Sequence, residues 1–278
     1  MKDPSTIIGS LDVIIQAMAG SHGFDISRYE EAFLRKTIAR RMAASGGGTV
    51  AAYGERLAGD RAEAEIFFYS LRIDHSEFFR NPLTFAVLGQ LVLPGLVEAK
   101  KKSGGEIRVW SAGCATGQEA WSLAILLEEL AWPVPYRIFA TDLAEPDFAR
   151  AGVYTAEAVG NVRARHLSEY FSRQGESFSV VPRLRERVDF SAYDLLDGSS
   201  ASPAASIYGG FDLILCCNLL YYYRQEARHQ ILKKICHALS SGGYFVTGKV
   251  ERGMVSEHRE FNAVLPPAAV FRMTNVSP

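Results

Sequence analysis

Residues 107–117 read Ile-Arg-Val-Trp-Ser-Ala-Gly-Cys-Ala-Thr-Gly, and the apolar stretch Glu119–Leu130 follows at once. The first four residues predict a buried strand, the glycines a tight turn, and the apolar stretch a helix. This order of strand, loop and helix lets a nucleotide-like ligand approach backbone N–H groups. Only Gly113 and Gly117 lie in the loop, so it lacks the G-x-G-x-x-G fingerprint of a pyrophosphate-binding loop.

Short apolar runs alternate with helical stretches along the rest of the chain after residue 107. Such alternation predicts an α/β fold with a mostly parallel, doubly wound, Rossmann-like sheet. Between the second and third runs, residues 166–187 are too polar for a core strand and too interrupted for a helix, which predicts a small β insertion. The predicted core strands are Ile107–Trp110, Tyr136–Ala140, Val188–Phe190, Phe211–Cys217 and Tyr244–Thr247.

The residues before Ile107 contain helical patterns and no strand candidate. Apolar residues recur at helical spacing from Ser10, placed as an N-cap, to Met18. Further helices are predicted at Ser27–Ala44, Val50–Leu57 and Ala62–Leu71. We therefore expect a helical N-terminal domain at residues 9–71, a linker at 72–84 and a larger domain at 85–278.

The bulk composition excludes some classes of partner. The 278 residues include 30 Lys and Arg against 31 Asp and Glu, so no global field attracts nucleic acid or an anionic membrane. No stretch reaches the roughly 18 uninterrupted apolar residues that a membrane span needs, and we expect a cytoplasmic protein. The adjacent Cys216 and Cys217 suit neither an ordinary disulfide with each other nor a spaced metal clamp, so reduced thiols are expected.

The second predicted strand runs into Phe139-Ala-Thr-Asp142. An acidic residue at this place in a Rossmann-like sheet can accept hydrogen bonds from both hydroxyls of a ribose. The alternative is that Asp142 caps the helix that precedes Ala151, a role that needs no ligand.

Five motifs occur in an order that resembles the CheR family of chemotaxis receptor methyltransferases. They are Ser76-Glu-Phe-Phe-Arg80, Ser111-Ala-Gly-Cys-Ala-Thr-Gly-Gln-Glu119, Ala140-Thr-Asp142, Cys216-Cys-Asn218, and Gly242-Gly243 with Gly248 through Glu251. The resemblance covers nearly the whole chain. It implies transfer of a methyl group from S-adenosylmethionine to glutamate side chains on the cytoplasmic helical bundle of a chemoreceptor, with S-adenosylhomocysteine as the product.

The resemblance also implies roles for individual residues. Arg80 and Tyr222 are expected at the methyl-transfer site, where Arg80 orients a carboxylate and also lies at the cofactor. Glu119 and Asp142 are expected to hold polar groups of the cofactor. Asp194 and Leu195 are expected to meet the adenine, and Asn218 to line the floor of the cofactor site. The whole expected cofactor set is Asp74, Ser76, Arg80, Gly113, Glu119, Asp142, Asp194, Leu195, Cys217 and Asn218.

Three of these residues have a plainer alternative role. Arg80 would otherwise be a surface arginine that follows two core phenylalanines. Glu119 would be a carboxylate favoured by the N-terminal end of the helix dipole, and Tyr222 an aromatic residue packed at a strand end.

The sequence departs from the usual family pattern at several positions. Asp74 stands where asparagine is common, Ser76 where threonine is, and Asp194 where asparagine often is. Cys217 stands where an arginine normally precedes Asn218, which removes a positive charge beside the cofactor. We expect these departures to change affinity, substrate choice or activity rather than the fold.

A basic helical face is the predicted contact with the receptor. If the segment from residue 27 is helical, Arg28, Arg35, Lys36 and Arg40 fall within roughly 140° of arc. By the resemblance this face docks on acidic receptor helices. It can equally be a solvated surface.

The β insertion of some family members binds a peptide at the C-terminus of the receptor. The stretch Phe171–Val188 resembles the shorter type of insertion, which does not depend on such a peptide.

Two other classes of function compete with a protein-glutamate methyltransferase. One is a non-catalytic signalling module that binds S-adenosylmethionine or S-adenosylhomocysteine, for which Cys217 and the extra aspartates Asp74 and Asp194 are the motive. The other is a methyltransferase with a different protein or a small molecule as acceptor. An NAD-dependent dehydrogenase ranks last because the phosphate-binding glycines are incomplete.

Overall fold

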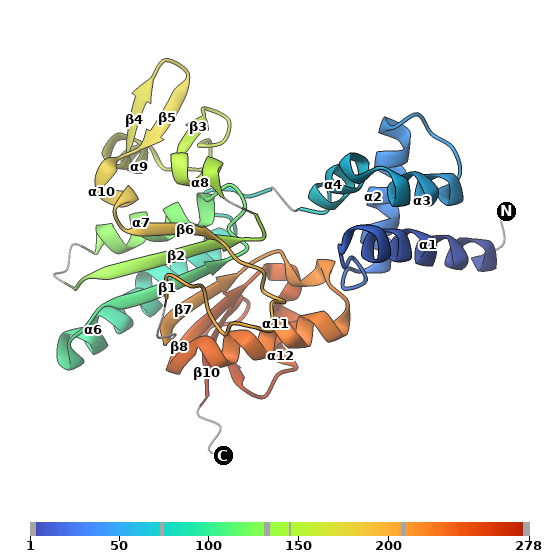
Figure 1. Ribbon diagram of the computed structural model, residues 1–278. Helices are drawn as coiled ribbons and strands as arrows, with labels where there is room; N and C mark the ends of the chain where they lie inside the picture. The colour runs from blue at the N-terminus through green and yellow to red at the C-terminus, as the bar shows by residue number, and fades with distance from the viewer. Residues whose placement is uncertain (1–3, 73–74, 131–133, 145, 207–209, 275–278) are drawn as a thin grey trace. The chain divides into compact units, whose positions relative to one another are not determined.

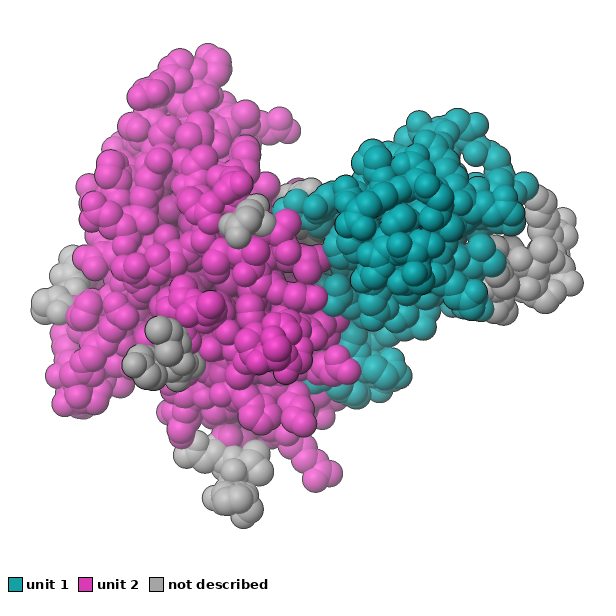
Figure 2. Space-filling view, viewed as in Figure 1, with its two compact units in different colours: residues 1–73, 221–229 teal, residues 74–220, 230–278 magenta. Residues whose placement is uncertain are grey.

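The computed structural model describes residues 4–72, 75–130, 134–144, 146–206 and 210–274, with side chains from Leu11 onward (Figure 1). These residues form two compact units. The first comprises residues 1–73 and 221–229, and the second comprises residues 74–220 and 230–278 (Figure 2).

The first unit is helical over its N-terminal part. Two of its helices carry side-chain caps, because Thr49 Oγ1 accepts the N–H of Ala52 at 3.2 Å and Asp60 Oδ1 accepts that of Glu63 at 3.1 Å. Its helices are α1 (Pro4–His22), α2 (Glu31–Ala44), α3 (Val50–Gly59) and α4 (Arg61–Tyr69). Its buried apolar side chains include Ile14, Met18, Leu34, Leu57 and Phe67.

The starts of the first two helices differ from the sequence-based prediction. Helix α1 begins at Pro4 rather than at Ser10, because proline is tolerated in the first turn of a helix. Helix α2 begins at Glu31 rather than at Ser27. The carboxylate of Asp25 accepts the N–H and the hydroxyl of Ser27, at 2.9 and 2.6 Å, and this local turn competes with helix.

A buried carboxylate ties α2, α3 and α4 together. Glu63 is 4% exposed, receives hydrogen bonds from Arg41 at 2.8 Å and from the Tyr53 hydroxyl at 2.7 Å, and lies 3.6 Å from Arg56. Burial raises the pKa of Glu63, but the bonds from Arg41 and Tyr53 outweigh it and the pKa is lowered overall. The charged Glu63 carboxylate therefore stabilises the fold of this unit.

A distant segment of the chain, residues 221–229, joins the first unit. Its Tyr223 forms an antiparallel bridge with Tyr29, and the two rings stack at 5.0 Å. The N–H of Glu30 donates to the carbonyl of Tyr222 at 2.8 Å, and that of Arg224 donates to Arg28 at 2.9 Å. The sequence-based division did not group this segment with the N-terminal helices.

The second unit is built on a seven-stranded sheet of order β6-β2-β1-β7-β8-β10-β9, in which the first five strands run parallel. The predicted α/β fold with a Rossmann-like sheet is confirmed. The strands are β1 (Ile107–Ala112), β2 (Tyr136–Asp142), β6 (Val188–Ala192), β7 (Phe211–Cys216), β8 (Leu239–Thr247), β9 (Phe261–Ala263) and β10 (Val270–Met273).

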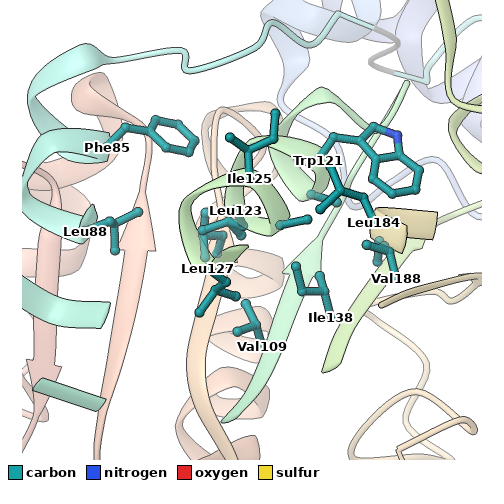
Figure 3. Close-up of a cluster of buried hydrophobic side chains, with 14 of the residues drawn as sticks. Phe85, Leu88, Val109, Trp121, Leu123, Ile125, Leu127, Ile138, Leu184 and Val188 are labelled. Carbon is teal, nitrogen blue, oxygen red and sulfur yellow. The ribbon is translucent and has the colours of Figure 1, made fainter. Parts of the chain in front are cut away.

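Helices cover this sheet and fill the core between them with apolar side chains. Figure 3 shows Trp121, Leu123, Ile125 and Leu127 of one helix among side chains of β1, β2 and β6. The helices and helical turns are α5 (Pro82–Val87), the π-helical η1 (Leu88–Val92), α6 (Leu93–Ser103), α7 (Gln118–Glu129), α8 (Asp147–Ala151), α9 (Ala164–Tyr170), α10 (Pro182–Arg185), η2 (Leu220–Tyr222, partly in the first unit), α11 (Gln225–Ala238, likewise), η3 (Lys249–Glu251) and α12 (Arg252–Ser256).

One continuous helical stretch, residues 82–103, is long and apolar enough to pass the length and composition test for a membrane span. Its side chains Phe85, Leu88 and Val92 are buried in the core against the sheet. It therefore reads as a core helix of this unit.

A second, antiparallel sheet of order β3-β5-β4 lies between β2 and β6 in the chain. Its strands are β3 (Val153–Thr155), β4 (Phe171–Gln174) and β5 (Ser177–Val180). Two of them fall within the β insertion expected at residues 166–187. The third, β3, precedes that segment, because the sheet pairs Val153–Thr155 with β5 across the intervening α9.

Candidate functional site

The carboxyl ends of the parallel strands meet at one edge of the large sheet, and the chain reverses its direction of travel across the sheet at β1. From β1 it proceeds to β2 and β6 on one side, and later to β7 and β8 on the other. Ligands of open α/β sheets bind at such a switch point. Strand ends at this edge supply Gly113, Asp142, Asp194 and Cys217.

The loop after β1 is held by backbone hydrogen bonds to strand β2 and within the loop itself. The N–H groups of Gly113 and Cys114 both donate to the carbonyl of Thr141, at 2.8 and 2.9 Å, and the N–H of Gly117 donates to Cys114 at 2.9 Å. These N–H groups are therefore not free to cradle a phosphate. Gly117 has φ +90°, and a Cβ there would lie 2.7 Å from the Cβ of Ala149, so only glycine fits.

Asp142 joins the end of β2 to this loop. Its Oδ2 accepts the N–H of Ala115 at 2.9 Å, and its Oδ1 accepts that of Leu143 at 2.8 Å. It does not cap α8, whose N-cap is Pro146, so that alternative is wrong. A carboxylate oxygen accepts more than one hydrogen bond, so a fixed Asp142 can still receive two hydroxyl groups of a ligand.

Glu119 lies in the first turn of α7, as its plainer alternative also required. The hydroxyl of Ser111 donates to its Oε1 at 2.7 Å, and the thiol of Cys217 is a second partner. Burial raises the pKa of Glu119, with a further rise from Glu251, and these outweigh the opposite effects of Cys217, Ser111 and Arg80. A cationic group that binds beside Glu119 would therefore stabilise the charged form of this carboxylate.

The thiols at the end of β7 stay protonated. Burial raises the pKa of Cys217 well above 9.0, and the nearby carboxylates of Glu119 and Glu251 raise it further. Burial does the same for Cys216. Because the thiolate is the reactive form, neither cysteine is a strong nucleophile at neutral pH.

Asn218 follows Cys217 in a left-handed conformation with φ +59°. Its N–H donates to Glu251 Oε2 at 2.8 Å, whereas its own Oδ1 is buried and has no hydrogen-bond partner within the described residues. A buried acceptor without a donor is costly unless a ligand or water supplies one. Asn218 Oδ1 is therefore an acceptor that a ligand at this site can satisfy.

Sequence analysis did not assign Glu251 to the site. It is fully buried, and its Oε2 accepts from the N–H groups of Asn218 and Gly248, both at 2.8 Å, and from Thr247 Oγ1 at 2.9 Å. Gly248 lies so close that a Cβ would sit 2.7 Å from this oxygen. The available signal was Glu251 three residues after Gly248 directly behind a strand, the spacing of a reciprocal helix cap.

The remaining predicted residues are placed as follows. Leu195 is buried, and Asp194 after β6 accepts the N–H of Leu196 at 2.9 Å. Arg80 is partly exposed and acts electrostatically on Glu119. Ser76 is partly exposed on the segment before Arg80, and Asp74 lies outside the described residues.

Tyr222 belongs to the first unit by its contacts. Its ring packs on Phe33 with centroids 4.7 Å apart, and its hydroxyl lies 3.0 Å from that of Tyr221. This arrangement agrees with the alternative of an aromatic residue packed after a strand end. Its role in methyl transfer stays a prediction.

The family model of the CheR methyltransferase SAM-binding domain matches residues 74–268. The chain belongs to the CheR methyltransferase family. It is 31% identical over 232 residues to a chemotaxis protein methyltransferase of Listeria innocua, covering 83% of this chain and 85% of that protein. It is 34% identical over 197 residues to chemotaxis protein methyltransferase 1 of Pseudomonas aeruginosa, covering 67% and 69%.

A third relative is much longer. An uncharacterised 104.1 kDa protein of Rhodobacter capsulatus is 31% identical over 284 residues, which is 96% of this chain but 28% of that protein. The family domain therefore also occurs within a larger chain.

This CheR-family protein uses S-adenosylmethionine as cofactor and yields S-adenosylhomocysteine. The described residues fit such a ligand. Asp142 offers acceptors for ribose hydroxyls, Glu119 offers a buried carboxylate that favours a cation, and Asn218 Oδ1 lacks a donor.

Proposed function

We propose that this protein transfers the methyl group of S-adenosylmethionine to glutamate side chains of a chemoreceptor cytoplasmic domain, forming γ-glutamyl methyl esters in the cytoplasm. The observation that carries the proposal is the grouping of Glu119, Asp142 and Asn218 at the switch point of a family-matched domain. The names of the relatives, chemotaxis protein methyltransferases, support the choice of acceptor.

The cofactor, when bound, supplies a methyl group on a positively charged sulfur. A glutamate acceptor has an ordinary pKa of about 4.3, so it is already a carboxylate at neutral pH and needs no general base. The protein has to bind this carboxylate, orient it and exclude water. We assign the orientation of the acceptor carboxylate to Arg80. Its planar guanidinium matches a carboxylate, and its charge already acts on Glu119.

The neutral thiol of Cys217 suits this chemistry. A thiolate beside the electrophilic methyl group would compete with the acceptor for it. Burial and the carboxylates of Glu119 and Glu251 raise the pKa of Cys217 and suppress that side reaction.

The first unit is proposed to meet the receptor through α2, over a narrower basic surface than the sequence indicated. Arg28 precedes the helix, Arg35 is paired with Glu31 at 2.6 Å, and Arg40 donates to the carbonyl of Ser70 at 3.0 Å. Lys36 is exposed and is the best placed to meet an acidic receptor helix.

Labelled methyl transfer to a receptor cytoplasmic fragment tests the proposal. We expect label in the fragment that is released by mild base, as a methyl ester is, and no label when the acceptor glutamates are changed to glutamine. Base-stable label would indicate a different acceptor chemistry.

A non-catalytic binding module is the second candidate, and Cys217 in place of the family arginine is the observation that favours it. This reading expects S-adenosylhomocysteine binding by the same protein without transfer to any receptor fragment tested.

A further inference from the structure

Arg80 lies between two residues whose backbone is left-handed. Phe79 has φ +52° and Asn81 has φ +62°. This region is sterically disfavoured for residues with a Cβ, and a bulky residue such as phenylalanine is seldom found there. Such conformations persist only where the surroundings enforce them.

The backbone on the two sides of Arg80 is enforced by different contacts. The N–H of Phe79 donates to the hydroxyl oxygen of Ser122 at 3.0 Å, and the Ser122 hydroxyl donates to the carbonyl of Gln118 at 2.7 Å. Ser122 is fully buried in α7, the helix that also carries Glu119. On the other side, Pro82 fixes the first turn of α5.

The Phe79 ring is held by two further rings. It lies 5.5 Å from Phe85, edge to face, and 5.3 Å from the imidazole of His166. His166 is 3% exposed and its Nε2 lies 2.9 Å from Glu129 Oε1, at the end of α7. Both Ser122 and His166 therefore anchor residue 79 to the same helix.

Packing alone does not hold the Arg80 side chain. A cavity of about 530 Å³ borders Phe79, Arg80, Asn81 and His166. Within the described residues Arg80 makes no hydrogen bond, and only its electrostatic effect on Glu119 is seen. With open space beside it, the direction of this side chain depends on the backbone from which it projects.

We propose that Ser122 and His166 are positioning residues that hold Phe79 in its left-handed conformation and thereby fix the backbone from which the Arg80 side chain projects and acts on Glu119. Arg80 acts on the ligand, and the other two act through it. The proposal rests on the proposed function for the part that Arg80 plays in the site.

Asn81→Gly and Ser122→Ala test the proposal, each alone and each combined with Arg80→Ala. Glycine adopts positive φ without steric cost, so Asn81→Gly releases the restraint without opposing the fold. The primary measurement is the dissociation constant of S-adenosylhomocysteine by calorimetry, which needs no acceptor. The free energy of unfolding is measured on the same samples.

We expect Arg80→Ala to weaken S-adenosylhomocysteine binding about tenfold, and each single variant to weaken it by roughly three- to tenfold. In the Arg80→Ala background the same changes should have no further effect, which is the signature of action through Arg80. Ser103→Ala is the matched control, because Ser103 donates to the carbonyl of Ala99 as Ser122 does to Gln118, but is itself exposed at the end of α6.

His166→Leu extends the same cycle to the second anchor, with the same expectation. Unchanged affinity in Asn81→Gly and Ser122→Ala, or losses as large without Arg80 as with it, would overturn the proposal. So would wild-type affinity in Arg80→Ala. Failure of the wild type to methylate receptor fragments would contradict the proposed function instead. The S-adenosylhomocysteine affinities of the single and double variants would still test the positioning role of Ser122 and His166.

Discussion

At the residue scale the site is a set of carboxylates in different surroundings. Asp142 is bound by two backbone N–H groups, Glu251 by three donors on one oxygen, and Glu119 by a hydroxyl and a thiol while burial raises its pKa. Hydrogen-bond donors favour the charged form of a carboxylate and burial opposes it. Because the pKa of Glu119 is raised, a cationic ligand that binds beside it would stabilise its charged form.

The raised pKa of Glu119 makes stability depend on pH. Between its ordinary value of 4.5 and the raised value, the folded protein binds more protons than the unfolded chain, so the free energy of unfolding falls as pH rises through this window. Urea unfolding of the ligand-free protein at a series of pH values should show this fall, and Glu119→Gln should lose it. A variant with the same pH profile as the wild type would contradict the assignment.

Residue-level signals predicted where Asp142 and Glu119 lie in the fold. Asp142 ends a strand and Glu119 lies at a helix start, where neighbouring residues reveal their place. The contact of Glu251 with Asn218 was not predictable, because Asn218 is 33 residues away in sequence and meets it only once β7 and β8 pair. The effect of Asp74 on the site stays a prediction.

At the element scale, Glu251 ties the ends of β7 and β8 together. Three donors converge on its Oε2 from Asn218, Thr247 and Gly248. The sequence located both strands from their apolar runs. It did not reveal β9 and β10, which are short, nor β3, because strands of three or four residues carry too little periodicity.

Glu251→Ala should therefore destabilise the protein strongly. Each buried donor that loses its acceptor costs about 1–3 kcal/mol, so we expect a loss of about 3 kcal/mol or more in the free energy of unfolding. Urea titration measures this loss. Glu257→Ala, an exposed position just beyond α12, is the control and should change stability by less than about 0.5 kcal/mol. Equal effects of the two substitutions would show that the hydrogen-bond cluster is not structural.

At the scale of the whole molecule, two units share one chain that passes between them more than once. The sequence predicted a helical first part and an α/β second part, because periodicity changes near residue 107. It could not predict that residues 221–229 join the first unit, since the bridge between Tyr29 and Tyr223 links segments almost 200 residues apart. Such pairing has no local signal.

Charge reversal on the first unit tests its part in receptor docking. Lys36→Glu should lower kcat/KM for a receptor cytoplasmic fragment about threefold to tenfold, mainly through slower association, and added salt should shrink the difference. Glu31→Lys is the matched reversal of sign on the same helix and should act in the opposite direction. A Lys36→Glu variant with wild-type kcat/KM at low salt would exclude this surface.

We expect S-adenosylmethionine to bind at the carboxyl ends of the parallel strands, with Asp142 as an anchor. Calorimetric titration with S-adenosylhomocysteine, comparing the wild type with Asp142→Asn, tests it most directly; Asp147→Asn, an exposed carboxylate on α8, is the control. We predict saturable binding that Asp142→Asn weakens about tenfold or more and Asp147→Asn leaves unchanged. Binding that survives Asp142→Asn unaltered would show that Asp142 does not anchor the ligand, and no binding by the wild type would show that these strand ends do not form the cofactor site.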